Sequence, residues 1–218
     1  VDTGKVPFGA VMNAAGTVAY VSNWGGRVPR AGDLTAPTGL RPDSDHVVVN
    51  QRGIASTGSL TRIDLKSRRA THSIPVGLHP TSMAWDERRG RLYVANNNED
   101  SISVVDTGRQ RVVSTFALEP FGKKLAGVAP TALVLSGDGD TLYAACGGLN
   151  AVAVLRASDG AMLGWIPTAW YPNDLALSPD GRYLAVSTLL GVGSGWRGDP
   201  AKRYVHAVRG SVHVVPVP

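Results

Sequence analysis

Short apolar runs recur along the chain, separated by clusters of Gly, Asp, Asn and Ser. One group of four reads "TSMAW", "RLYVAN", "SISVVD" and "VVSTF". Runs of this length, rich in Val, Ile and Tyr and bounded by turn residues, are typical of β-strands. None is long enough for an amphipathic helix, and no 3.6-residue period persists. The pattern therefore predicts an all-β chain of short antiparallel strands.

The runs repeat in register. A proline opens each unit, and the four are Pro7, Pro80, Pro130 and Pro172. Thirteen residues after each proline stands a second marker: Tyr20, Tyr93, Tyr143 and Ala185. The 42 residues from Pro130 to Pro172 divide into intervals of 13, 13, 10 and 6, which recur elsewhere. We assign repeat units to about residues 7–79, 80–129, 130–171 and 172–218, with insertions at about 24–57, 119–128 and 191–209.

Four strands in roughly 42 residues is typical of a β-propeller blade. A turn phrase such as "SPDGR" lies between the first two strands of each unit, with Gly16, Gly139 and Gly181 at one shared place. Stacked blades cover each other's faces. We predict a β-propeller of four-stranded antiparallel blades within a single segment, residues 1–218. About four blades' worth is present, as an open arc or part of a larger ring.

The stretch "GRLYVANNNEDSISVVDTGRQRVV" resembles the YVTN-repeat, YncE-like propeller family, whose consensus phrase is matched by Tyr93, Val94, Ala95 and Asn96. "SNWGGRVPRAGD", "IPTAWYPNDLALSPDG" and "LLGVGSGW" are similar to the propeller half of bacterial proteins that carry an alkaline-phosphatase-type phosphoesterase domain. The resemblance implies an exported protein, periplasmic or extracellular, whose parent is a hydrolase. No position among these 218 residues matches that domain's metal-binding or nucleophile motifs.

The three insertions carry the net charge. They fall on connections that emerge at one end of an antiparallel blade, so we expect them on one face. They contain ten basic and five acidic residues, which accounts for the whole formal net charge of +5. Loops on a rigid scaffold commonly carry function. The expected ligand or partner face comprises Trp24, Arg27, Arg30, His46, Lys123, Lys124, Trp196, Arg197, Arg203, Tyr204 and His206.

A second candidate region is the mouth of the central channel. His79, Tyr171 and Asp174 lie at the starts of inner strands, where a channel would open. No Ser, His and acid assemble into a catalytic set. No cofactor or metal site is predicted, because "PDSDH" and "SGDGD" fit solvated turns.

Besides a surface that binds polyanions, whose affinity would fall steeply with salt, two functions stay open. The first is a non-catalytic binding or scaffold module that presents the basic face to an anionic ligand or to a phosphoesterase domain of the same parent chain. The alternative is a propeller enzyme, lactonase-like or quinoprotein-dehydrogenase-like, whose channel-mouth site is completed by further blades. The modest charge argues against a nucleic-acid partner. No apolar run approaches the roughly 18 residues of a membrane span.

Overall fold

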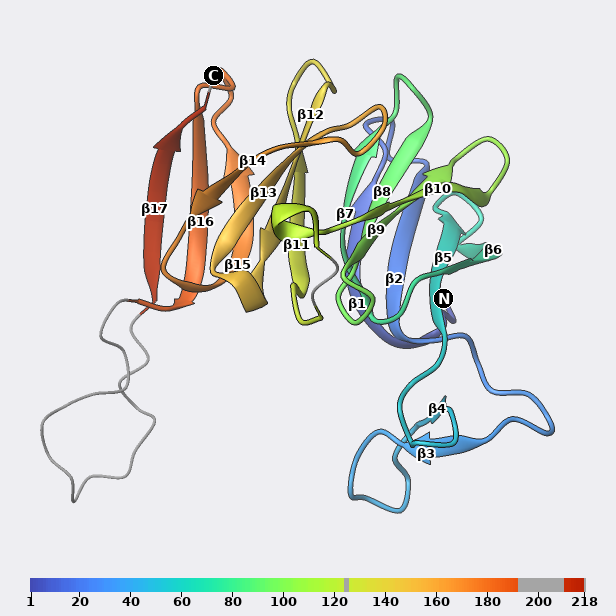
Figure 1. Ribbon diagram of the computed structural model, residues 1–218. Coiled ribbons are helices and arrows are strands. Elements are labelled where there is room, and N and C mark those ends of the chain that lie inside the picture. Colours follow the sequence, from blue (N-terminus) through green and yellow to red (C-terminus); the bar gives the residue numbers. More distant parts are fainter. Residues whose placement is uncertain (124–125, 192–209, 218) are drawn as a thin grey trace, which may run out of the picture. The chain divides into compact units, whose positions relative to one another are not determined.

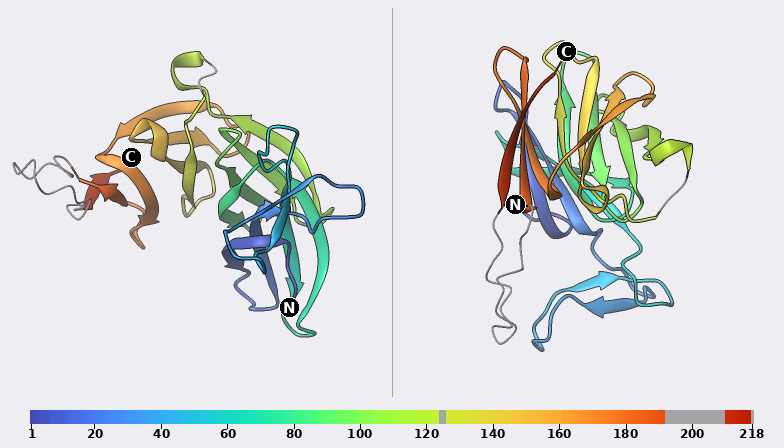
Figure 2. Two further views of the ribbon diagram at one scale, coloured as in Figure 1. Left: turned by 90° about the horizontal axis from the view of Figure 1, so that it is seen from below. Right: turned by 60° about the vertical axis from the view of Figure 1, so that its left-hand side comes forward.

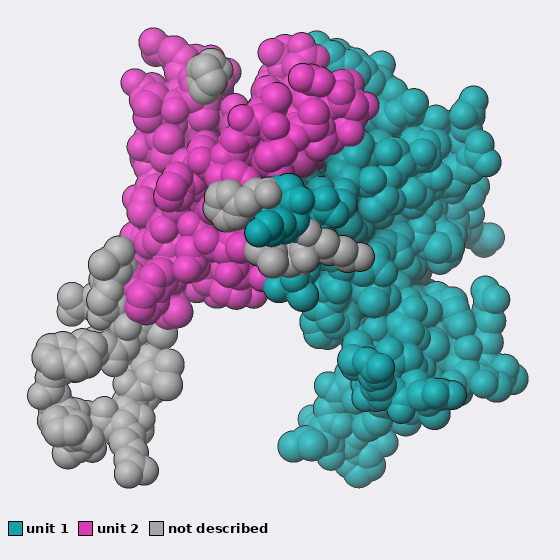
Figure 3. All heavy atoms as spheres, viewed as in Figure 1, with its two compact units in different colours: residues 1–126 teal, residues 127–218 magenta. Residues whose placement is uncertain are grey.

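The computed structural model describes residues 1–123, 126–191 and 210–217 (Figure 1). Those residues form seventeen β-strands and two single-turn 3-10 helices. No described helix has the length and apolar character that crossing a membrane would require. The chain divides into two compact units, Val1–Ala126 and Gly127–Pro218 (Figure 3). The predicted all-β class is confirmed.

Unit 1 contains two four-stranded antiparallel sheets. The first has the order β1 (Lys5–Met12), β2 (Val18–Gly26), β5 (Gly58–Asp64) and β6 (Arg69–Val76). The second consists of β7 (Pro80–Asp86), β8 (Arg91–Asn96), β9 (Ser101–Asp106) and β10 (Arg111–Ala117). A small hairpin, β3 (Thr35–Pro37) and β4 (His46–Val48), lies between β2 and β5. The right-hand view of Figure 2 shows this hairpin beyond the ends of the sheet strands.

Unit 2 contains the next two sheets. The third sheet consists of β11 (Pro130–Leu135), β12 (Thr141–Cys146), β13 (Ala151–Arg156) and β14 (Met162–Pro167). The fourth has three described strands, β15 (Trp170–Leu177), β16 (Tyr183–Leu190) and β17 (Ser211–Pro216). The 3-10 turns are η1 (Pro120–Gly122), which follows β10 in unit 1, and η2 (Gly147–Leu149), between β12 and β13. Each sheet is a meander in chain order, as expected of a propeller blade.

The backbone repeats at the same place in all four blades. The residue before each unit-opening proline has a left-handed conformation, with φ between 50° and 57°, and these residues are Val6, His79, Ala129 and Tyr171. Non-glycine residues rarely adopt this region, and a following proline restricts them further. The turn glycines Gly16, Gly139 and Gly181 also share positive φ. The same rare conformation therefore recurs at one fixed place relative to the four opening prolines.

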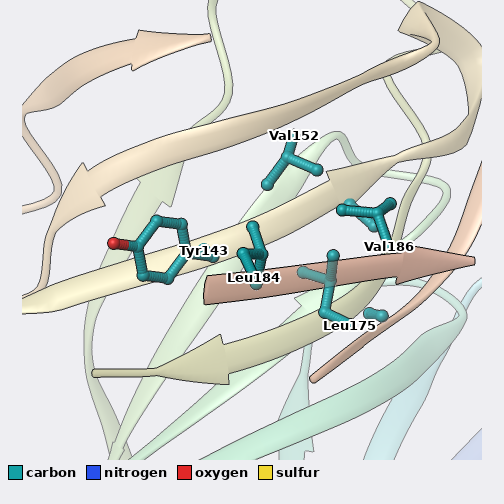
Figure 4. Close-up of a cluster of buried hydrophobic side chains, with 7 residues drawn as sticks. Tyr143, Val152, Leu175, Leu184 and Val186 are labelled. Carbon is teal, nitrogen blue, oxygen red and sulfur yellow. The ribbon is translucent and has the colours of Figure 1, made fainter. Parts of the chain in front are cut away.

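Each unit buries its core between its two sheets. In unit 1, Tyr20 and Leu60 pack with Leu92 and Val94 of the next blade. In unit 2 the equivalent places are held by Tyr143, Val152, Leu184 and Val186, which converge in Figure 4. Full burial of one such side chain contributes about 1.5–3 kcal/mol. The buried apolar residues of each repeat are therefore the ones that join one blade to the next within a unit.

The connections of unit 1 fall at defined ends of the strands. Lys5 pairs with Gly26, and Gly58 pairs with Val76, so the β2–β5 and β6–β7 connections emerge together. We call this the insertion end of unit 1, since residues 27–57 leave and return there. The hairpin is tied to it by Lys5, whose Nζ lies 2.6 Å from Oδ1 of Asp45.

Candidate functional site

Trp24 and His79 come together at the insertion end of unit 1, although the sequence placed them in different candidate regions. Their rings stack with centroids 3.9 Å apart and planes inclined by 18°. Trp24 keeps 37% of its surface exposed, whereas His79 is buried. Neither buried ring nitrogen of His79 has a hydrogen-bond partner of ordinary geometry among the described residues.

The environment of His79 favours its neutral form. Burial lowers the pKa of the ring, because a charged imidazolium loses its hydration, and the nearby Asn98 side chain opposes that shift only in part. The Trp24 ring covers one face of the imidazole and offers it no hydrogen-bond acceptor.

Acidification is expected to destabilise unit 1. The folded pKa of His79 is below the ordinary value of 6.5. Between the two values the unfolded state binds more protons, so stability present above the ordinary pKa is lost as the pH falls toward the folded pKa. The slope reaches at most about 1.4 kcal/mol per pH unit. Urea unfolding of wild type and His79→Tyr across this range tests the effect. An equal acid loss in both proteins would contradict it.

Tyr171 holds the same place in unit 2. A Cβ on Gly147 would lie 3.0 Å from Cζ of Tyr171, so the tyrosine ring covers that glycine as Trp24 and His79 cover each other. The backbone N–H of Tyr171 donates to Oδ1 of Asn150 at 2.9 Å. In both units the side chain before the proline packs on the residue directly after one repeat place of the previous blade, the place that Asn23 and Cys146 hold. Asp174, further along β15, is exposed.

Asp33 closes a short loop after β2. Its carboxylate makes a two-pronged ion pair with Arg27, at 2.6 Å and 2.7 Å, and accepts the backbone N–H of Arg30 at 2.6 Å. The Arg27 and Arg30 bonds hold the pKa of Asp33 down at about 2. The Arg30 guanidinium is exposed and has no hydrogen bond or ion pair within the part of the chain that the structure describes.

A surface hollow of about 440 Å³ lies beside this loop. Arg27 and Arg30 line one part, and Thr71, His72 and Ser73 of β6 line another. The remaining lining residues are Asp2, Thr3, Gly4, Val28, Pro29, Thr61 and Ala70.

The insertion end is not uniformly basic. A second hollow in unit 1, of about 660 Å³, is lined by Glu99, Asp100 and Glu119. The two hollows therefore have opposite charge, one beside β6 and the other beside β10.

The other predicted face residues are more scattered. His46 is exposed on the hairpin, with Nδ1 3.3 Å from the Thr35 hydroxyl. Lys123 is exposed just after η1. Six predicted residues lie outside the described residues: Lys124, Trp196, Arg197, Arg203, Tyr204 and His206. No group of three His, Cys, Asp or Glu suited to a metal ion occurs within 1–123, 126–191 and 210–217.

The sequence did not reveal one close pair, Ser211 and His213. These residues are two positions apart in β17 and therefore share one face of the strand. Ser211 Oγ lies 3.0 Å from His213 Nε2 and 2.8 Å from the Thr188 hydroxyl. A serine beside an imidazole has the form of a nucleophile and its base. However, the backbone N–H of Ala169 also donates to Nε2, at 3.2 Å, so the imidazole lone pair is already engaged.

The same arrangement recurs in unit 1 without a histidine. Thr61 Oγ1 accepts the N–H of Gly4 at 3.1 Å and the amide of Asn23 at 3.0 Å. Gly4, Asn23 and Thr61 hold the repeat places of Ala169, Thr188 and His213. The cluster therefore ties the segment before a blade to that blade's third strand, which is a structural role. Its signal in the sequence is the recurrence of polar residues at buried repeat positions.

Comparison with known proteins agrees with this architecture. No model of a protein family matches the chain. Over 121 residues, or 54% of its length, the chain is 35% identical to the seven-bladed beta-propeller protein Rv1057 of Mycobacterium tuberculosis. This chain is a β-propeller. The matched segment covers 29% of the length of Rv1057.

Two solved structures share the propeller's fold. Hydrazine synthase of Kuenenia stuttgartiensis has a TM-score of 0.67 and 23% identity, covering 99% of this chain and 47% of that one. A putative 6-phosphogluconolactonase from Bacteroides uniformis has a TM-score of 0.53 and 16% identity, covering 83% and 50%. At these identities the likeness concerns the fold alone. The YncE-like assignment and the phosphoesterase fusion stay predictions.

Proposed function

We propose that this propeller is a non-catalytic binding module that presents its insertion end to an anionic ligand or partner. One observation carries the proposal. Every aspartate of the first insertion, residues 24–57, has a cationic partner, and these pairs are Asp33–Arg27, Asp43–Arg41 and Asp45–Lys5. Arg30 and Arg52 have no ion pair among the described residues and are exposed. The charged side chains of this insertion that remain available to a ligand are therefore cationic.

The partner that we propose is a phosphoesterase-type domain of the same parent chain, in an exported protein. Support comes from "SNWGGRVPRAGD", the stretch similar to such fusions, because it contains the whole loop from Arg27 to Asp33. We also propose that further blades complete the ring. Val212 of β17 is 69% exposed and Met12 of β1 is 57% exposed, at positions that face a neighbouring blade elsewhere.

Removing three cations of the insertion end is expected to weaken binding to a polyanion. The triple variant Arg30→Gln, Arg52→Gln and Lys123→Gln should elute from immobilised dextran sulfate at lower salt than wild type. Each released counterion contributes roughly 0.7–0.9 to the slope of log K against log salt, so the slope should fall by about 2. The matched control, Lys66→Gln, Arg68→Gln and Arg109→Gln, removes equal charge from turns at the opposite end of unit 1. Equal losses in both variants would rule out this face.

A further inference from the structure

We propose that the hollow between the Arg27–Asp33 loop and β6 is a specific site for a small organic phosphate or sulfate ester. This inference rests on the proposed function, because it names the ligand class that the insertion end would bind. A specific site differs from general electrostatic attraction because its binding groups must be held in place. The hydrogen bonds and the ion pair of this loop hold them.

The loop holds Arg30 ready for a ligand. Asp33 accepts two N–H groups of Arg27 and the backbone N–H of Arg30, while its own N–H donates to the Arg30 carbonyl at 3.1 Å. Two-pronged guanidinium–carboxylate pairs are geometrically specific as well as strong. The backbone of Arg30 is therefore fixed on both sides while its guanidinium stays exposed at the hollow. A site ordered in advance loses less entropy on binding.

The β6 side of the hollow adds hydrogen-bond donors. Thr71 does not add one, because its Oγ1 donates to the Arg62 carbonyl at 3.2 Å and accepts an N–H of the Arg62 guanidinium at 2.8 Å. The hydroxyl of Ser73 and the ring of His72 have no hydrogen bond within the described residues, and both line the hollow. Guanidinium, hydroxyl and imidazole groups can all donate. A tetrahedral oxyanion offers three acceptor oxygens to such a set.

Size and the remaining lining define the rest of the ligand. A volume of about 440 Å³ exceeds what one inorganic anion fills and falls within the range of small-molecule sites. Val28, Pro29 and Ala70 offer apolar contact for an organic body. The Asp2 carboxylate also lines the hollow and would repel a second anionic group. A monoester with a neutral body therefore fits best.

Titration calorimetry with phenyl phosphate, phenyl sulfate, inorganic phosphate and phenol tests the proposal. We expect wild type to bind the two esters more tightly than inorganic phosphate, and phenol least. Arg30→Gln should weaken ester binding about tenfold or more, because a charged hydrogen bond contributes roughly 1.5–3 kcal/mol. Arg52→Gln is the matched control, since Arg52 is an exposed cation of the same insertion outside the hollow.

The Asp33→Asn variant distinguishes a specific binding site from diffuse electrostatic attraction. The substitution makes the protein more positive by one charge, so a diffuse electrostatic attraction would strengthen ester binding. A site that depends on the Asp33-closed loop would instead bind the esters more weakly. Stronger binding by Asp33→Asn would overturn the proposal.

The outcomes also distinguish this inference from the proposed function. Equal weakening by Arg30→Gln and Arg52→Gln, or binding of phenol as tight as that of phenyl phosphate, would exclude the hollow as an ester site. If wild type binds no ester but its retention on dextran sulfate still depends on the three insertion-end cations, this inference fails and the proposed function stands. Ester binding that is weakened by Arg30→Gln and by Asp33→Asn, but not by Arg52→Gln, supports the site.

Discussion

Replacing Gly148 by alanine is expected to lower the free energy of unfolding by about 3 kcal/mol, because inserting a carbon into a closed contact forces the backbone apart. A Cβ at Gly148 would lie 1.7 Å from the carbonyl oxygen of Gly127. That oxygen belongs to the backbone, so no side-chain rotation relieves the clash. The N–H of Gly148 also donates to the Val128 carbonyl at 3.1 Å, which holds the two segments together.

Gly164→Ala is the matched control in the same blade. Gly164 lies in β14, has no atom within 4 Å of its would-be Cβ, and has no positive φ. Alanine there should be neutral, or stabilising by about 0.4–1 kcal/mol through the unfolded chain. Urea unfolding followed by circular dichroism compares the variants. Similar stability of Gly148→Ala and Gly164→Ala would show that the backbone at Gly127 accommodates a Cβ at position 148 without cost.

Leu60→Ala is expected to cost about 2–5 kcal/mol, the range for removing a buried leucine side chain and leaving a cavity. Leu60 has no exposed surface and packs on Leu92 and Val94 of the next blade. Val212→Ala is its repeat-matched control, because Val212 holds the same place in the fourth blade but is 69% exposed. Exposed substitutions usually change stability by no more than about 0.5 kcal/mol.

Hydrogen exchange is the suitable measurement for this pair, because a chain with two compact units need not unfold in a single step. Leu60→Ala should speed amide exchange in β5 and β8, the strands on either side of the cavity, and leave unit 2 unchanged. Val212→Ala should leave both units unchanged. A large loss of protection around β17 in Val212→Ala would contradict this and would mean that the apolar face is covered in solution.

Repetition made the blade interior predictable from the chain alone. The place of Tyr20 recurs as Tyr143, and Leu92 recurs as Leu184, because a strand buries every second residue and the repeat keeps those residues in register. The turn glycines followed from the same spacing. Confirmation of the all-β propeller fold shows that local periodicity, which requires only neighbouring residues, is sufficient for the class and for most of the core.

The candidate sites were predictable only in part. Arg27 and Arg30 could be assigned to a decorated face from their place in an insertion. The pairing of Arg27 with Asp33, which neutralises one base and positions the other, depends on how the loop folds. The charge count over the insertions gave no sign of the acidic hollow beside β10, because its carboxylates come from two separate connections.

The sequence by itself determined the all-β class and the four-stranded antiparallel blades, because these depend on periodic burial and on short turns. Only the tertiary structure decided which distant side chains meet. Trp24 and His79 stack across 55 positions of sequence because one blade's end packs against the start of the next. Ser211 and His213 resemble a catalytic pair, but Ala169 donates to His213 as Gly4 donates to Thr61 in another blade, which marks the cluster as structural. Such contacts are set by the stacking of sheets, which no local pattern encodes.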